Sequence, residues 1–108
     1  MTEQVLNHHL SAFAVGVDEI MKDYTASSVL IAPEGTYRGL DEIRAFFQGF
    51  VDHFPADAWE SFQVLRTEVS GEVAYLLWDA RPLVMLGTDT FLVRDGKIAV
   101  QTYASHAG

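Results

Sequence analysis

The second half of the chain constrains the fold most, because from Trp59 onward it is a run of strand patterns separated by turn signals. The expected strands span residues 61–69, 73–81, 84–93 and 97–103. The breaks between them fall at Ser70-Gly71, at Pro82 and at Arg94-Asp95-Gly96-Lys97. The first half instead has helical periodicity. Helices first and a run of adjacent strands last predict an α+β fold with an antiparallel sheet.

Three helices are expected before the strands. The first begins near Thr2, and its apolar residues recur at helical spacing at Leu6, Leu10, Phe13 and Val17. A short second helix is expected over residues 19–24. The third, over residues 40–54, has the clearest apolar stripe, formed by Ile43, Phe47, Phe50 and Phe54. Between the second and third helices, residues 29–32 read as a short buried strand that ends at Pro33.

Composition limits the classes of function. The chain has 108 residues, of which 49% are hydrophobic, so we expect one domain over 1–108 with a real core. A net charge of −8 with 7 Lys and Arg makes nucleic acid and anionic membranes poor partners. The absence of cysteine excludes disulfides, thiol nucleophiles and thiolate metal sites. No signal-peptide pattern follows Met1 and no apolar run has the length of a membrane span, so a cytoplasmic protein is expected.

Asp89 stands out because it interrupts the apolar strand pattern of residues 84–93. A carboxylate that faces the interior of a small domain is unfavourable unless it is paired or protonated. Asp89 is therefore either a structural acid that is satisfied by neighbouring groups or part of a functional site. We predict that its pKa is raised, because burial disfavours the charged form and no Lys or Arg lies within two residues of it along the strand to offset this.

The register of the last hairpin decides which residues accompany Asp89. A two-residue loop at Asp95-Gly96 pairs Val93 with Ile98 and places Asp89 opposite Thr102. A three-residue loop pairs Val93 with Lys97 and places Asp89 opposite Gln101. We prefer the second, because it gathers one mixed, pocket-like face from Asp89, Phe91, Gln101 and Tyr103, and one apolar face from Leu92, Ile98 and Val100.

Several local strings, in this order, resemble known proteins. Phe13 to Ile20 resembles the helix-helix corner of nuclear transport factor 2-like proteins. Val29 to Pro33, Tyr37 to Arg44, and Gly87-Thr88-Asp89 followed by Arg94 to Ile98 resemble the SnoaL-like branch of that superfamily. The resemblance covers nearly the whole chain. It implies a cone-shaped fold of three helices on a strongly curved antiparallel sheet, with a pocket between the layers and usually a homodimer.

The resemblance also suggests site residues. In ketosteroid isomerase-like members a proton-abstracting aspartate precedes the proline of the first strand, and that position is Ala32 here. The oxyanion-hole tyrosine of the first helix corresponds to His8, and the second oxyanion-hole acid corresponds to Asp89. His9 follows His8 directly and lies about 100° away around the helix, so at most one of the two can face the pocket, and the sequence leaves open which one. SnoaL-like cyclases rely on one acid/base aspartate in the late strands, which Asp89 also resembles.

The first functional hypothesis is therefore a SnoaL-like isomerase or cyclase that acts on an apolar carbonyl compound, with Asp89 as acid/base and His8 stabilising an oxyanion. The pocket is expected to be lined by Tyr103, Gln101, Phe91, Tyr24, Phe47, Phe50, Trp59 and Trp78. The alternatives are a non-catalytic ligand-binding domain and a dimerisation module of the same fold.

Partners and cofactors follow from the same patterns. A small apolar ligand and a homodimer through Leu92, Ile98 and Val100 are expected. No metal is expected, since His53 and His106 have no histidine partner at helical spacing. No nucleotide cofactor is expected, since no glycine-rich loop precedes a helix.

Overall fold

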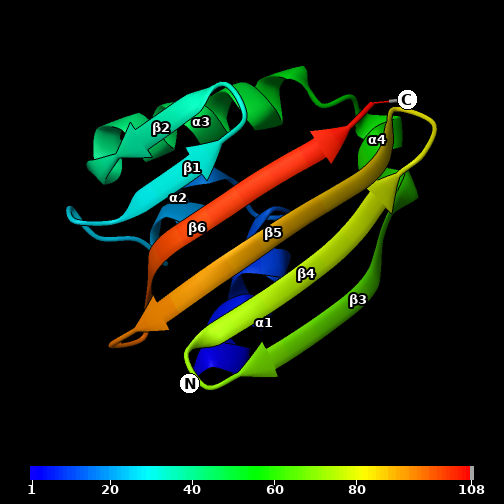
Figure 1. The fold of residues 1–108 in the computed structure, drawn as a ribbon. Helices are drawn as coiled ribbons and strands as arrows, with labels where there is room; N and C mark the ends of the chain where they lie inside the picture. The colour runs from blue at the N-terminus through cyan, green and yellow to red at the C-terminus, as the bar shows by residue number, and fades with distance from the viewer. Residues whose placement is uncertain (108) are drawn as a thin grey trace.

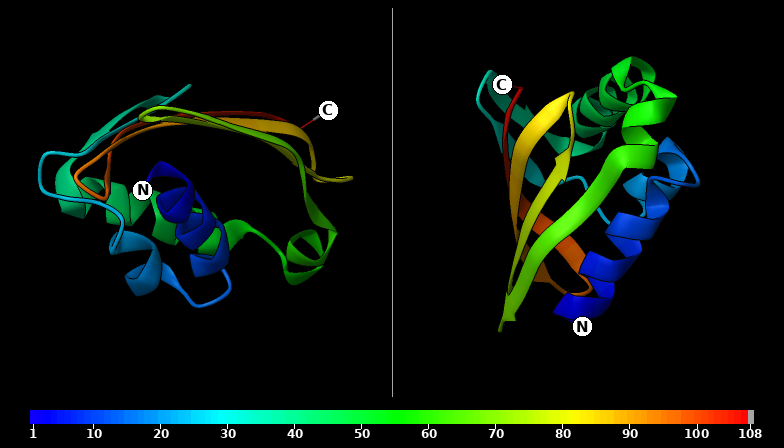
Figure 2. Two further views of the ribbon diagram at one scale, coloured as in Figure 1. Left: turned by 90° about the horizontal axis from the view of Figure 1, so that it is seen from below. Right: turned by 90° about the vertical axis from the view of Figure 1, so that its right-hand side faces the viewer.

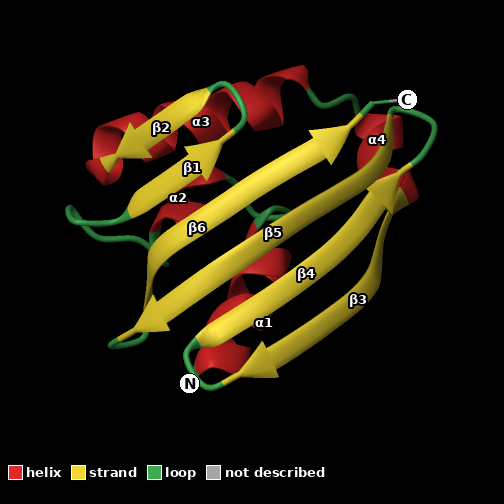
Figure 3. Cartoon of the chain, in the orientation of Figure 1, coloured by secondary structure: helices red, strands yellow, loops and turns green. Residues whose placement is uncertain are grey.

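The computed structural model describes residues 1–107 as a layer of helices on one six-stranded sheet (Figure 1). Figure 3 shows the helices grouped behind the sheet. Within residues 1–107, no helix is both long enough and apolar enough to cross a membrane. The elements, in chain order, are α1 (Thr2–Ala12), α2 (Val17–Met21), β1 (Val29–Ala32), β2 (Gly35–Arg38), α3 (Gly39–His53), α4 (Ala56–Ser61), β3 (Phe62–Ser70), β4 (Val73–Ala80), β5 (Val84–Arg94) and β6 (Lys97–His106).

The strand order is β2-β1-β6-β5-β4-β3, so the first strand of the chain lies beside the last. All pairs are antiparallel except β1 and β6, which run parallel with Leu30 opposite Gln101. The sheet is strongly curved, and the helices lie on its concave side (Figure 2). The expected α+β cone is therefore confirmed, with three additions: the strand β2, the six-residue helix α4 and the parallel β1–β6 pair.

Helix α3 forms where the apolar stripe predicts it. Ile43 and Phe47 are fully buried, while Phe50 and Phe54 are partly buried near the C-terminal end of the helix. The helix stops before Pro55, which has an extended backbone and precedes α4. The stripe thus anchors α3 to the core at one end and leaves its aromatic side chains at a cavity at the other.

The preferred register of the last hairpin is wrong, both at the turn and at Asp89. Val93 pairs with Ile98 across a two-residue loop, in which Asp95 and Gly96 both have positive φ, 54° and 75°. A bulge at Ala99 then shifts the register by one residue, so that Asp89 lies opposite Tyr103 rather than Gln101 or Thr102.

The bulge has a tertiary cause. The N–H of Ile98 donates to the carbonyl of Asp23 at 2.7 Å, and the Ser28 hydroxyl donates to the carbonyl of Ile98 at 2.6 Å. The segment before β1 therefore takes both backbone groups of Ile98. Ile98 is turned inward and is 1% exposed, so it does not belong to the outer face where it was expected.

Candidate functional site

A cavity of about 430 Å³ lies between the helices and the concave face of the sheet. Its walls come from α1, α3, α4 and the four strands β3 to β6. Most of the lining side chains are aromatic or aliphatic, and the polar ones are His9, Asp89, Gln101 and the Tyr103 hydroxyl. The size and composition suit one small, mostly apolar molecule. The full lining is His9, Leu10, Phe13, Ala14, Phe46, Phe47, Phe50, Phe54, Trp59, Phe62, Leu76, Trp78, Asp89, Gln101 and Tyr103.

Asp89 is held at the cavity wall by two donors from neighbouring strands. The Trp78 indole N–H donates to Oδ1 at 2.9 Å, and the Gln101 amide donates to Oδ2 at 2.8 Å. Each carboxylate oxygen therefore receives one hydrogen bond and keeps a further lone pair. Asp89 itself is 7% exposed.

Burial raises the pKa of Asp89 to about 6, and the hydrogen bonds from Trp78 and Gln101 oppose this rise. The carboxyl group can therefore exchange a proton near neutral pH. A pKa close to the working pH is what an acid/base group needs. The predicted rise in the pKa of Asp89 agrees with this placement.

Gln101 is itself fixed from the helical side. The Tyr24 hydroxyl donates to Gln101 Oε1, which orients the amide so that its Nε2 faces Asp89. Tyr24 and Gln101 are both fully buried. A chain of hydrogen bonds thus runs from Tyr24, in the segment after α2, through Gln101 on β6 to the carboxylate of Asp89 on β5.

The histidine that lines the cavity is His9, whereas His8, which the resemblance suggested as the oxyanion-stabilising group, does not line it. His9 is 2% exposed and follows Val5 by four residues and Leu6 by three, so it shares their buried helix face. That spacing was the sequence signal for His9. Counting back from Pro33 led to His8 instead, because the count ignored the helix face.

The His9 ring is enclosed by aromatic side chains. The centroids of Phe91 and Phe13 lie 5.0 Å and 5.1 Å from its own. Its Nδ1 is buried, has no hydrogen-bond partner within residues 1–107 and lies 3.9 Å from Asp23 Oδ2. This leaves Nε2 as the ring nitrogen that can meet a ligand. Burial, followed by the nearby His8, lowers the pKa of His9 to about 3, so the ring is neutral at ordinary pH.

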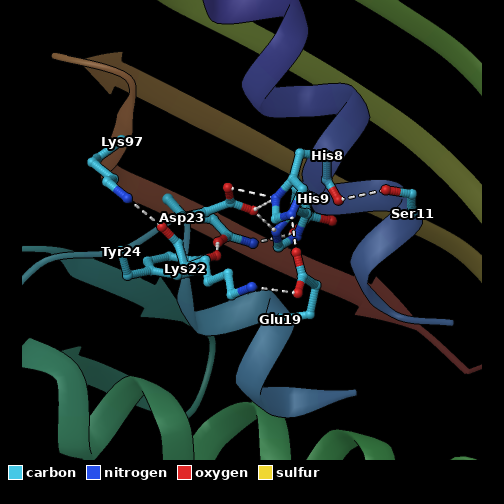
Figure 4. Close-up of polar contacts among 10 residues, drawn as sticks. His8, His9, Ser11, Glu19, Lys22, Asp23, Tyr24 and Lys97 are labelled. Atoms are coloured by element: carbon cyan, nitrogen blue, oxygen red, sulfur yellow. Dashed lines mark hydrogen bonds and ion pairs between the residues drawn. The ribbon is translucent and has the colours of Figure 1, made fainter. Parts of the chain in front are cut away.

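His8 belongs to a polar cluster outside the cavity (Figure 4). Its Nε2 lies 2.6 Å from Glu19 Oε2, and its Nδ1 lies 2.7 Å and 2.9 Å from the two oxygens of Asp23. The hydrogen bonds to Glu19 and then to Asp23 raise the pKa of His8. Burial raises the pKa of Asp23, although His8 opposes that rise. The cluster joins α1 to α2 and lies on the Nδ1 side of the His9 ring, 3.9 Å from that nitrogen at Asp23 Oδ2.

The structure brings most of the predicted lining residues together. Tyr103, Gln101, Phe47, Phe50, Trp59 and Trp78 all line the cavity with Asp89. Phe91 and Tyr24 do not line it, but pack behind the His9 ring. Sequence reasoning missed Phe13, Phe46, Phe54 and Phe62, which add further aromatic walls.

The described residues offer no cluster of three His, Asp or Glu side chains that could hold a metal ion. The polar groups at the cavity are one titratable carboxyl, one neutral imidazole, one amide and one phenol. This set can move a proton and can hydrogen-bond an oxygen of a bound molecule.

Comparisons with known proteins identify the family. Three solved structures share the fold. An NTF-2 like protein of unknown function from Burkholderia xenovorans LB400 has a TM-score of 0.78 and 19% identity, over 99% of this chain and 84% of that one. A candidate polyketide cyclase from Sinorhizobium meliloti has a TM-score of 0.76 and 17% identity, over 93% of each chain, and a candidate isomerase of the SnoaL-like family from Agrobacterium tumefaciens has a TM-score of 0.70 and 13% identity, over 95% of each chain. No curated protein matches the chain. Residues 7–101 match the SnoaL-like domain, and on that match the chain belongs to the SnoaL-like domain family.

Proposed function

We propose that this protein moves a proton on a small apolar carbonyl compound, in an isomerase- or cyclase-type reaction with Asp89 as acid/base. The observation that carries the proposal is the position of Asp89: a buried carboxyl with a pKa of about 6 on the wall of a mainly aromatic cavity. Two similar structures are a candidate polyketide cyclase and a candidate isomerase, which fits this reaction class.

In the proposed reaction, ionised Asp89 takes a proton from a carbon next to the ligand's carbonyl group. The C–H electron pair moves into the carbonyl and forms an enolate. Asp89 then returns the proton to another carbon for isomerisation. In a cyclisation the enolate carbon attacks a second carbonyl of the same molecule, and the new alkoxide takes the proton. The hydrogen bonds from Trp78 and Gln101 keep the carboxylate oriented between these steps.

His9 takes the oxyanion-stabilising role that the sequence suggested for His8. A neutral imidazole donates one N–H and does not itself need to titrate near neutral pH. His9 Nδ1 has no hydrogen-bond partner within residues 1–107, and Asp23 Oδ2 lies 3.9 Å from it. The His9 proton can therefore reside on Nε2 and be donated to the enolate oxygen.

The test uses a panel of apolar ketones that carry an acidic C–H next to the carbonyl, including keto-steroids and aromatic polyketide-like ketones. Each compound is incubated with wild type in D₂O, and exchange of the C–H next to the carbonyl is followed by NMR. We expect at least one compound to exchange, and Asp89→Ala to slow that exchange by about 10²–10⁴-fold. His9→Ala should slow it by roughly 10-fold or more.

His8→Ala is the matched control, since it removes the neighbouring imidazole outside the cavity. It should retain both exchange and binding. In a parallel thermal-shift screen, Asp89→Ala should weaken binding about ten- to hundred-fold, in line with the loss of a buried hydrogen bond. If wild type and Asp89→Ala exchange a compound at the same rate, or if His8→Ala has the larger effect, the proposed site is wrong.

A second candidate is a non-catalytic ligand-binding domain, and the observation that favours it is Ala32. Ala32 is buried at the position of the proton-abstracting aspartate in the resembling isomerases, so that base is missing. This candidate predicts compounds that bind with a dependence on Asp89 and yet show no enzyme-dependent exchange in D₂O.

A further inference from the structure

Trp78 and Gly87 are paired across β4 and β5, two residues away from the pair formed by Leu76 and Asp89. The indole of Trp78 lies over the backbone of Gly87. A Cβ at position 87 would stand closer than 3.0 Å to three indole atoms, including Nε1 at 2.7 Å. No real Cβ tolerates such an approach without displacement of the ring. Because residue 87 is a glycine, the Trp78 indole on β4 can lie directly over the backbone of the neighbouring strand β5.

The geometry points to Gly87 as a positioning residue for Asp89: its missing side chain provides the space in which the Trp78 indole aims Nε1 at Asp89 Oδ1. The inference rests on the proposed role of Asp89 as the reacting carboxyl. Trp78 is 3% exposed and packs against Phe62, with ring centroids 5.3 Å apart, so the ring has little freedom to reach Asp89 from another direction.

The consequence is electrostatic. The indole N–H stabilises the charged form of Asp89 and opposes the effect of burial on its pKa. Gln101 supplies the second donor independently, from the opposite neighbouring strand. Loss of the indole contact would leave one carboxylate oxygen without a donor in an apolar surrounding, and the pKa of Asp89 would rise further.

The first measurement uses wild type, with ¹³C NMR of the Asp89 carboxyl and ¹⁵N NMR of the two indole N–H groups across pH 4 to 8. Trp78 and Trp59 are the only tryptophans in the chain. The Trp78 indole signal should titrate with the same midpoint as the Asp89 carboxyl. Trp59 lines the same cavity and serves as the internal reference, with a smaller change at that midpoint.

Three variants then distinguish the effect of the indole hydrogen bond on the pKa of Asp89 from the effect of side-chain packing on stability. Trp78→Phe keeps a ring and removes the donor, and should raise the midpoint of Asp89 by roughly one pH unit or more. Gly87→Ala should raise it as well and should also lower the melting temperature, because the added methyl displaces the indole. The double variant Gly87→Ala/Trp78→Phe should recover part of the melting temperature, because the smaller ring leaves more space, and should keep the raised midpoint of Trp78→Phe.

An Asp89 midpoint in Gly87→Ala equal to that of wild type would overturn the inference. If Gly87→Ala does not fold, a Trp78→Phe midpoint equal to that of wild type would overturn it equally. These readouts need no substrate. A raised midpoint in the variants together with no proton exchange in any ketone would leave Gly87 as a positioning residue and refute the proposed reaction. If wild type exchanges a ketone proton but the Asp89 midpoint is the same in Trp78→Phe and in wild type, the proposed reaction stands and the positioning role of Gly87 is refuted.

Discussion

Asp89 on β5 and His9 on α1 face the same cavity, and burial shifts the pKa of each toward its uncharged form. The pKa of Asp89 rises to about 6, while that of His9 falls to about 3. Between these two values neither group brings a charge to the cavity. Above pH 6 the only one of the two that becomes charged is Asp89, which makes it the acid/base candidate of the pair.

Asp89→Asn should change how stability depends on pH. The folded pKa of Asp89, about 6, lies above its ordinary value of 3.8, so the unfolded chain releases this proton first as pH rises. The carboxyl therefore lowers the free energy of unfolding between pH 3.8 and 6, by roughly 3 kcal/mol in total. Urea unfolding from pH 4 to 7 should show the wild-type value falling relative to that of Asp89→Asn. A constant difference between the two proteins would mean that Asp89 is solvated or paired with a charge.

His9→Phe should have the opposite effect. The folded pKa of His9, about 3, lies below its ordinary value of 6.5, so the unfolded chain binds this proton first as pH falls. His9 therefore destabilises the fold as pH falls from 6.5 toward 3, by roughly 1.4 kcal/mol per pH unit. Phenylalanine suits the aromatic surroundings and cannot titrate, so the variant should lose less stability in acid. His53→Phe, at an exposed position, controls for the loss of one histidine.

These two contributions oppose each other between pH 3.8 and 6. In wild type the two groups should therefore contribute little net change of the free energy of unfolding with pH. In each single variant, the pH dependence caused by the remaining group should become visible. Stability should rise with pH in Asp89→Asn and fall with pH in His9→Phe. The double variant, compared with wild type, tests whether the two groups act independently, since a shared cavity can couple them.

We propose that the outer sheet face forms a homodimer. The helices cover only the concave face (Figure 2), and the convex face carries Leu77, Leu86, Leu92 and Val100. Leu86 is 44% exposed. Light scattering at micromolar concentration should give about twice the chain mass of 12.0 kDa.

Leu86→Glu should shift the measured mass toward that of one chain, because it places a charge on the proposed interface. Val15→Glu is the control, since Val15 is 74% exposed in the turn after α1 and lies away from the sheet. A wild type with the mass of a single chain would refute the dimer.

Two glycines with open space around them should respond in opposite directions to alanine. Gly96 has a φ of +75° in the β5–β6 turn, so Gly96→Ala should lower the free energy of unfolding by roughly 1 kcal/mol. Gly49 lies within α3, where Gly49→Ala should raise it by up to about 1 kcal/mol. Chemical denaturation measures both. A neutral Gly96→Ala would mean that the turn adopts another conformation in solution.

Periodicity alone predicted much of this fold. The stripe of α3 and the strand breaks at Ser70-Gly71 and Pro82 are local signals, and the observed element ends lie within a few residues of the expected ones. The inward face of β5 was also predictable, because side chains alternate along a strand and Asp89 shares its face with Phe91.

The rest depended on contacts between distant residues. The bulge at Ala99 exists because Asp23 and Ser28 bind the backbone of Ile98, and no local pattern indicates that. His9 was passed over for His8 because adjacent histidines differ only by their position around the helix. The close approach of the Trp78 indole to Gly87 likewise joins two different strands, so local sequence does not identify the partner.

The pairing of β1 with β6 also bears on how the chain folds as it is synthesised. Leu30 rests against Gln101, and the Tyr24–Gln101 hydrogen bond joins residues 77 positions apart in sequence. Every helix is synthesised before β6, so the apolar faces of α1 and α3 are incompletely covered until that strand is made. Such long-range pairing slows folding and exposes the nascent chain to aggregation. During that interval we expect the protein to be a client of general chaperones.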